Sequence, residues 1–191
     1  NYLLTQGCTR VLLSLGYKHE MVEEWLDKAD WDFEIEKVIE TEPLGTGGGI
    51  QLAMAKARTT DVFVVNGDTL FQADLKAMDS FHREKEARTS LALKSLQDFD
   101  RYGAVCCAAD GTILSFEEKK PVADGLINGG IYLINKAFFE QKGLPQRHSF
   151  EKDYLEAFVS EHQFYGYRSE AYFIDIGIPE DYERAQKDLP G

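Results

Sequence analysis

The chain has 191 residues, which suits a single domain with a sizeable hydrophobic core. Its net charge of −12, from 21 basic and 33 acidic residues, argues against nucleic acid or an anionic membrane as a partner. Three cysteines form no disulfide framework, which favours the reducing cytoplasm, and no apolar run approaches the roughly 18 residues of a membrane span.

Strands and helices alternate along the first half of the chain. Apolar or alternating runs predict strands over residues 10–15, 33–39, 61–66 and 89–95. Helical spacing predicts helices over residues 18–28, 50–58 and 73–87. The first of these helices is expected to bury Met21, Val22, Trp25 and Leu26, and the strand over 61–66 to be fully buried. This alternation predicts a mostly parallel, doubly wound sheet.

The second half begins with a hairpin, because two strand-like runs flank Asp110-Gly111. A strand over 126–134 carries Gly129-Gly130, and helices over 136–141 and 150–160 follow. Strands over 164–168 and 171–174 then precede a helix that begins at Pro179. The expected fold is α/β, a Rossmann-like, doubly wound mixed sheet in a single domain over residues 1–191.

A glycine-rich segment, Gly45 to Gly49, precedes the predicted helix over 50–58. A dinucleotide-binding fingerprint fails because Ile50 or Leu52 stands where a small residue is required. A Walker A loop fails too, since no Gly-Lys-Ser/Thr follows. Two interpretations remain open: a flexible entry into the helix, or a close approach of the backbone to a phosphate-bearing ligand.

Two aspartates, Asp68 and Asp175, each lie at or near the end of an apolar, strand-like run. Ligands of open α/β sheets gather outside the carboxyl ends of the strands, so the pair can hold one Mg²⁺ there. Taken alone, Asp68 is equally typical of an Asx turn after a strand. The four histidines show no metal-ligand spacing, which argues against zinc. No serine or cysteine nucleophile signature is present.

Two further polar segments are candidates for a sugar phosphate. Glu118 and Lys119 follow a predicted strand, and they are either part of a solvated loop or a carboxylate and an ammonium facing the crevice. Asn128 and Gly130 can add an amide and backbone donors for a sugar ring, since glycine in a strand often marks a close approach.

These motifs resemble, in the same order along the chain, those of the sugar-1-phosphate nucleotidylyltransferases. The matching segments are Pro43–Gly48, Asn66–Thr69, Phe116–Lys119, Asn128–Tyr132 and Phe173–Gly177. Four segments are most similar to the branch of that family that uses GTP and manno-heptose 1-phosphate. They are Phe99–Gly103, Ser115–Lys119, Leu126–Leu133 and Tyr172–Tyr182.

The resemblance implies roles for individual residues. Asp68 and Asp175 would ligate Mg²⁺, and Lys119 would meet the sugar phosphate. The sugar site would contain Gly103, Glu118, Asn128 and Gly130, and the nucleotide site Pro43, Gly45, Thr46 and Gly67. Apart from the resemblance, the donor edge of guanine calls for a carboxylate, and Glu40, just before the glycine-rich segment, is the candidate, with Glu42 the alternate. Residues 1–98 would form the nucleotide-binding half and residues 99–191 the sugar-phosphate half.

The implied reaction transfers GMP from GTP to D-glycero-D-manno-heptose 1-phosphate, and it yields GDP-heptose and pyrophosphate for bacterial lipopolysaccharide or capsule synthesis. The alternatives are a transferase for mannose, glucose or N-acetylmuramic acid 1-phosphate, or a non-catalytic module that binds nucleotide sugars. The family's first strand and Arg-bearing Gly-rich loop have no counterpart in these residues. The substrates together carry roughly six negative charges. One Mg²⁺ and Lys119 would compensate only part of that charge, so residues 1–191 alone are expected to bind the substrates but to be catalytically impaired.

Overall fold

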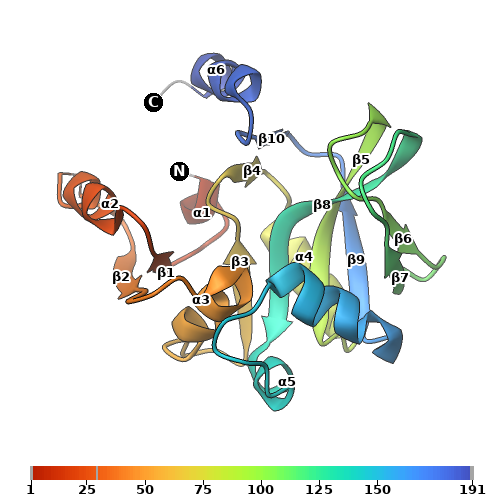
Figure 1. Cartoon of the computed structure of the whole chain (residues 1–191), viewed down its shortest axis with the longest axis horizontal. Helices are drawn as coiled ribbons and strands as arrows, with labels where there is room; N and C mark the ends of the chain where they lie inside the picture. The colour runs from red at the N-terminus through yellow and green to blue at the C-terminus, as the bar shows by residue number, and fades with distance from the viewer. Residues whose placement is uncertain (1, 29, 190–191) are drawn as a thin grey trace. The chain divides into compact units, whose positions relative to one another are not determined.

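The computed structural model describes residues 2–28 and 30–189, which form two compact units (Figure 1). The first unit comprises Asn1–Val62 and Lys136–Phe158, and the second comprises Phe63–Asn135 and Val159–Gly191. Each unit therefore combines two separate stretches of sequence. The expected division at residue 98 concerns binding roles rather than compactness, and it stays a prediction.

The first unit is built around a parallel strand pair. Arg10 stands opposite Glu34 in the pairing of β1 with β2, and its guanidinium bridges Glu34 and Glu36. Tyr154, Phe139 and Phe150 form a buried aromatic cluster from the later stretch. The elements are α1 (Tyr2–Thr5), β1 (Arg10–Leu15), α2 (His19–Leu26), β2 (Glu34–Ile39), α3 (Gly45–Met54), α5 (Lys136–Gln141) and the π-helical η1 (Phe150–Glu156).

Helix α2 does not bury the apolar face that its spacing predicts. Only Leu26 is buried, whereas Met21 is 65% and Trp25 58% exposed, and Val22 is exposed as well. Trp25 instead packs its ring against Trp31, with the ring centroids 4.9 Å apart. The expectation was wrong because helical periodicity identifies an apolar stripe but not the element that would cover it.

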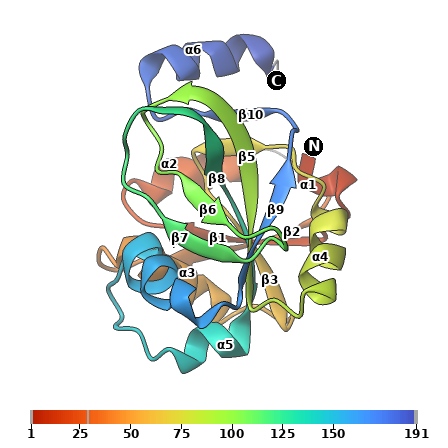
Figure 2. The same ribbon diagram turned by 90° about the vertical axis from the view of Figure 1, so that its right-hand side faces the viewer.

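The second unit contains a four-stranded mixed sheet in the order β3-β8-β5-β9 (Figure 2). Its strands are β3 (Asp61–Val65, of which residues 63–65 lie in this unit), β5 (Thr89–Phe99), β8 (Val122–Asn135) and β9 (Phe164–Ser169). β5 runs antiparallel to β8 and parallel to β9, which confirms the expected mixed sheet, although the alternation in the first half of the chain had indicated a mostly parallel one. β3 is half-buried rather than fully buried, with Val65 exposed.

Helix α4 (Leu75–Glu84) packs against β5, β8 and β9, and it buries Leu75 and Met78, whereas Phe81 is half-buried. The side chain of Asp74 caps it by accepting a hydrogen bond from the Ala77 N–H. The predicted hairpin is confirmed: β6 (Val105–Cys107) pairs antiparallel with β7 (Ile113–Phe116). One α-helix was expected over 150–160, but the π-helical η1 is followed by a short 3₁₀ turn, η2 (Val159–Glu161).

The last part of the second unit consists of a short strand pair and a helix. β4 (Thr69–Phe71), which no sequence pattern indicates, pairs antiparallel with β10 (Phe173–Asp175). α6 (Pro179–Asp188) follows with proline in its first turn, as predicted. No helix within residues 2–28 and 30–189 is both long and apolar enough to cross a membrane.

Candidate active site

The two predicted metal ligands lie at neighbouring positions in the second unit. Asp68 directly precedes β4 and Asp175 ends β10. In the antiparallel pairing of these strands Thr69 stands opposite Asp175, and the Ile176 N–H donates to the Asp68 carbonyl oxygen at 3.0 Å. The strand pair thus places the backbones of two aspartates from distant parts of the sequence next to each other.

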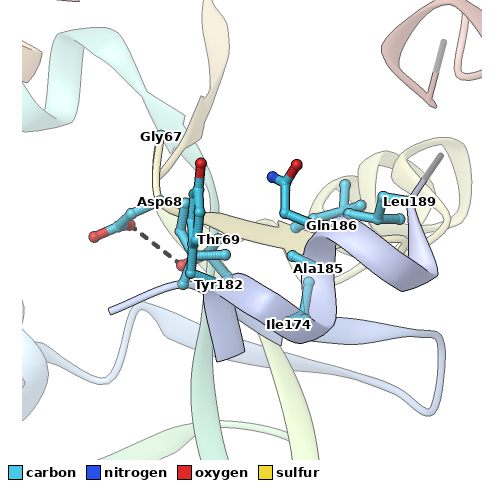
Figure 3. Close-up of a pocket in the computed structure, with 10 residues that line it drawn as sticks. Gly67, Asp68, Thr69, Ile174, Tyr182, Ala185, Gln186 and Leu189 are labelled. Carbon is cyan, nitrogen blue, oxygen red and sulfur yellow. Dashed lines mark hydrogen bonds between the residues drawn. The ribbon is translucent and has the colours of Figure 1, made fainter. Parts of the chain in front are cut away.

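Local contacts orient both carboxylates. The Gly177 N–H donates to Asp175 Oδ1 at 2.7 Å, and a Cβ at position 177 would lie 2.9 Å from that oxygen. Thr69 Oγ1 donates to Asp68 Oδ1 at 3.3 Å. Figure 3 shows the Asp68 carboxylate directed away from Gln186 and Leu189 of the adjoining cavity.

That cavity has a volume of about 240 Å³ and lies between β4, β10 and α6. Ile174 and Ile176 line it, whereas Asp175 does not, as strand alternation requires for the residue between them. Asp175 therefore points to the other face of β10. The cavity's lining includes Gly67 and Asp68 on one side, and Tyr182, Ala185, Gln186 and Leu189 on the other.

Two carboxylates, from Asp68 and Asp175, suit a hard divalent cation that takes only a few of its ligands from the protein. No cluster of three or more histidine, cysteine, aspartate or glutamate side chains that could hold a metal occurs in the described residues. Mg²⁺ does not need such a cluster, because it usually keeps several waters and takes one or two carboxylates plus substrate phosphates. Asp68 and Asp175 fit that requirement, and they do not fit a closed zinc site.

The turn that carries Gly103 meets the end of the β6–β7 hairpin. A Cβ at position 103 would collide with the Glu117 carbonyl oxygen, so the close approach requires glycine. Lys120 pairs with Glu117 at 2.6 Å, and that hydrogen bond, followed by one from Cys106, lowers the pKa of the Glu117 carboxyl. Glu118 and Lys119 are exposed, and no ion pair engages either of them in the described residues. Both remain available to a ligand.

Asn128 and Gly130 are tied to each other. Asn128 Oδ1 accepts a hydrogen bond from the Gly130 N–H at 3.1 Å, and its Nδ2 donates to the Tyr132 hydroxyl at 2.9 Å. Gly130 has φ +75° and its carbonyl accepts from the Asn66 N–H at 2.9 Å. The Asn128 amide thus has an internal structural role, and its contact with a sugar stays a prediction.

The glycine-rich segment is helical and belongs to the first unit. α3 begins at Gly45, so the prediction that the helix starts at Ile50 was wrong. Side chains at positions 47 and 48 would collide with the His148 ring and the Gln146 carbonyl oxygen. The close approach of Gln146 and His148 therefore explains why positions 47 and 48 are glycines. Thr46 Oγ1 donates to Glu151 at 3.0 Å and accepts from the Phe150 N–H at 2.9 Å.

Glu40 lies between the ends of β1 and β2 and the start of α3. Its Oε2 accepts a hydrogen bond from the Leu44 N–H at 3.2 Å, and a Cβ at position 49 would lie 2.7 Å from its Oε1. Glu42 and Pro43 are exposed beside it. One oxygen of Glu40 thus stabilises the turn into α3. Gly67, by contrast, belongs to the second unit and has open space around it.

Sequence reasoning assigned no role to Arg101, Tyr102 or His148. Arg101 Nη1 donates to Asp181 Oδ2 at 2.6 Å, and this hydrogen bond raises the pKa of the Arg101 guanidinium. His148 is buried against α3, and its carbonyl accepts from the Gly47 N–H at 3.0 Å. The sequence signal was Tyr102 beside Gly103, because the partners Asp181 of Arg101, Phe173 of Tyr102 and Gly47 of His148 are far away in the sequence.

Residues 1–190 match the family model described as Nucleotidyl transferase. The chain is 47% identical over 188 residues to D-glycero-alpha-D-manno-heptose 1-phosphate guanylyltransferase of Aneurinibacillus thermoaerophilus, covering 98% of this chain and 81% of the relative. It is 40% identical to the protein of the same name from Campylobacter jejuni, covering 95% and 79%. The structure of HddC from Yersinia pseudotuberculosis complexed with GMP-PN superimposes with a TM-score of 0.88 at 33% identity, over 98% of this chain and 82% of that one.

Proposed function

The chain belongs to the nucleotidyl transferase family, and we propose that it transfers GMP from GTP to D-glycero-D-manno-heptose 1-phosphate. The products are GDP-heptose and pyrophosphate. The observation that carries the proposal is the pairing of β4 with β10, which sets Asp68 beside Asp175 in a chain that is 47% identical to a heptose 1-phosphate guanylyltransferase.

The reaction needs no general base, because the attacking oxygen of the sugar phosphate is already anionic. Catalysis then depends on in-line positioning and on neutralising charge at the α-phosphate. Bound at Asp68 and Asp175, Mg²⁺ would supply the positive charge that the leaving pyrophosphate and the attacked phosphate require. Lys119, exposed and free of an ion pair among the described residues, provides an ammonium for the sugar phosphate.

The sugar ring is assigned to the second unit. Gly103 brings its turn against the Glu117 carbonyl, next to Glu118, whose exposed carboxylate is a hydrogen-bond acceptor for sugar hydroxyls. Gly130 of β8, whose backbone lies beside Asn66, contributes backbone groups to the proposed sugar site. The base is assigned to the turn around Glu40 in the first unit, where a carboxylate can accept two hydrogen bonds from the guanine edge.

The cellular setting follows from the substrates. GTP is a cytoplasmic nucleotide, and the three cysteines are free thiols, as a reducing compartment requires. We place the reaction in the cytoplasm, where GDP-heptose would feed the synthesis of lipopolysaccharide or capsule.

The test is product identification by mass spectrometry after incubation with GTP, Mg²⁺ and heptose 1-phosphate. The proposal predicts GDP-heptose and pyrophosphate in equal amounts, and neither product when any component is omitted. Asp68→Asn serves as the inactive control. GTP consumed without a nucleotide sugar would refute the transfer.

A further inference from the structure

Tyr102 lies between the proposed metal ligand Asp175 and the proposed sugar residue Gly103. It belongs to the turn after β5, and its half-buried ring meets the Phe173 ring edge to face at 6.1 Å. The Arg101 guanidinium lies over the Tyr102 ring, 5.5 Å from the ring centroid. The ring also packs against a buried cluster formed by Phe99, Ala104 and Ile127. Packing alone therefore holds the ring in place.

The contact with Phe173 places Tyr102 on the Asp175 side of β10. Side chains two residues apart on a strand share a face, so Phe173 and Asp175 point the same way. The Tyr102 ring, which packs on Phe173, therefore lies on the same face of β10 as the Asp175 carboxylate. Burial, and then the charge of Asp175, raises the pKa of Tyr102 above its ordinary value.

We propose that Tyr102 is a positioning residue that orients the Asp175 carboxylate for the divalent metal, a role that rests on the metal site of the proposed function. Asp175 Oδ1 already accepts the Gly177 N–H, so the tyrosine hydroxyl is a second donor to the same carboxylate. Hydrogen bonds of this kind set the orientation of a ligating group, and their loss typically costs about 10–100-fold in metal affinity or activity.

The turn that carries Tyr102 also carries Gly103 of the proposed sugar site. Gly103 follows Tyr102 directly, and its backbone contacts Glu117 at the end of the hairpin. The turn is anchored independently of the tyrosine hydroxyl, because Arg101 pairs with Asp181, which is 8% exposed and also binds Arg184 at 3.1 Å. Removing only the hydroxyl should therefore preserve the fold.

The experiment measures Mn²⁺ binding by electron paramagnetic resonance, with Mn²⁺ alone as the probe. Tyr102→Phe keeps the ring and is expected to raise the Mn²⁺ dissociation constant about tenfold, with an unchanged melting temperature. Tyr172→Phe is the matched control, because its hydroxyl also donates to an aspartate, Asp188, at 2.9 Å, away from the proposed site. Its dissociation constant should equal that of the wild type.

A third variant, Asp175→Asn, separates failure of this proposal from failure of the metal site. Wild-type affinity in Tyr102→Phe, combined with lost binding in Asp175→Asn, would overturn the positioning role and leave the metal assignment standing. An equal loss of affinity in Tyr102→Phe and Tyr172→Phe would also overturn it. Wild-type binding in Asp175→Asn, or no saturable binding by the wild type, would overturn the metal site and the positioning role together.

Discussion

At the scale of single residues, the proposed chemistry rests on two carboxylates whose backbones are joined by one strand pair. Asp68→Asn or Asp175→Asn keeps the size of the side chain but removes a charged oxygen ligand. We expect either variant to abolish turnover at any practical Mg²⁺ concentration without changing the melting temperature. Near-native turnover in either variant, measured by pyrophosphate release, would refute the ligand assignment.

Lys119 and Lys120 are neighbours with different partners. Lys120 pairs with Glu117 at 2.6 Å, whereas Lys119 is exposed and forms no such pair in the described residues. Lys119→Ala is expected to lose at least about 2 kcal/mol of transition-state stabilisation, or about 30-fold in kcat/KM for the sugar phosphate. Lys120→Ala is the control and should change that value little. Equal values for Lys119→Ala and wild type would assign Lys119 to a solvated loop.

Glu40 tests the choice of base. Glu40→Gln retains an oxygen that can accept the Leu44 N–H, so the turn into α3 is preserved, but it removes the charge that favours the guanine edge. We expect kcat/KM for GTP to fall more than for ATP or UTP. Glu42→Gln is the companion variant, because Glu42 is exposed nearby. If neither variant alters the order of nucleotide preference, a carboxylate does not select the base.

At the scale of elements, the sequence predicts whether a segment is a helix or a strand better than it predicts what that segment packs against. The strands, the hairpin and α4 follow from local periodicity and turn residues, which is why their positions agree with the structure. β4 spans only Thr69–Phe71 and depends on its partner β10, so no local pattern could reveal it. The glycines of α3 were ambiguous for the same reason, since the colliding groups on His148 and Gln146 lie far away in sequence.

Helix α2 provides a direct test of the difference between an apolar pattern and actual burial. Leu26 is 6% exposed and Met21 is 65% exposed, although both belong to the predicted inward face. Leu26→Ala should lower the free energy of unfolding by about 2–5 kcal/mol. Met21→Gln should change it by no more than about 0.5 kcal/mol. Denaturant unfolding measures both, and a large loss for Met21→Gln would mean that its side chain is covered in solution.

At the scale of the whole molecule, motif order predicts the family, but not how the chain divides into compact units. Residues 136–158 return to the first unit through contacts of η1 with α3, which the linear order of strands and helices does not indicate. The predicted site residues are divided between the two units. Glu40, Gly45 and Thr46 belong to the first unit, whereas both aspartates and Lys119 belong to the second.

The net charge of −12 is also a property of the whole molecule, and it makes selective recognition of an anionic sugar phosphate depend on a few local groups. Heptose and mannose 1-phosphate carry the same phosphate, so Lys119 and a metal cannot distinguish them. Discrimination must come from groups that meet the sugar hydroxyls, for which the proposed residues are Glu118, Gly103 and Gly130. Unpaired polar groups in a sugar site disfavour an analogue that lacks the matching hydroxyl.

The most direct measurement is therefore kcat/KM for pyrophosphate release, with GTP and Mg²⁺ held constant and the sugar phosphate varied. We predict that D-glycero-D-manno-heptose 1-phosphate gives a higher value than mannose, glucose or N-acetylmuramic acid 1-phosphate. An equal or higher value with any of these three sugar phosphates would contradict the assignment of this protein to GDP-heptose synthesis.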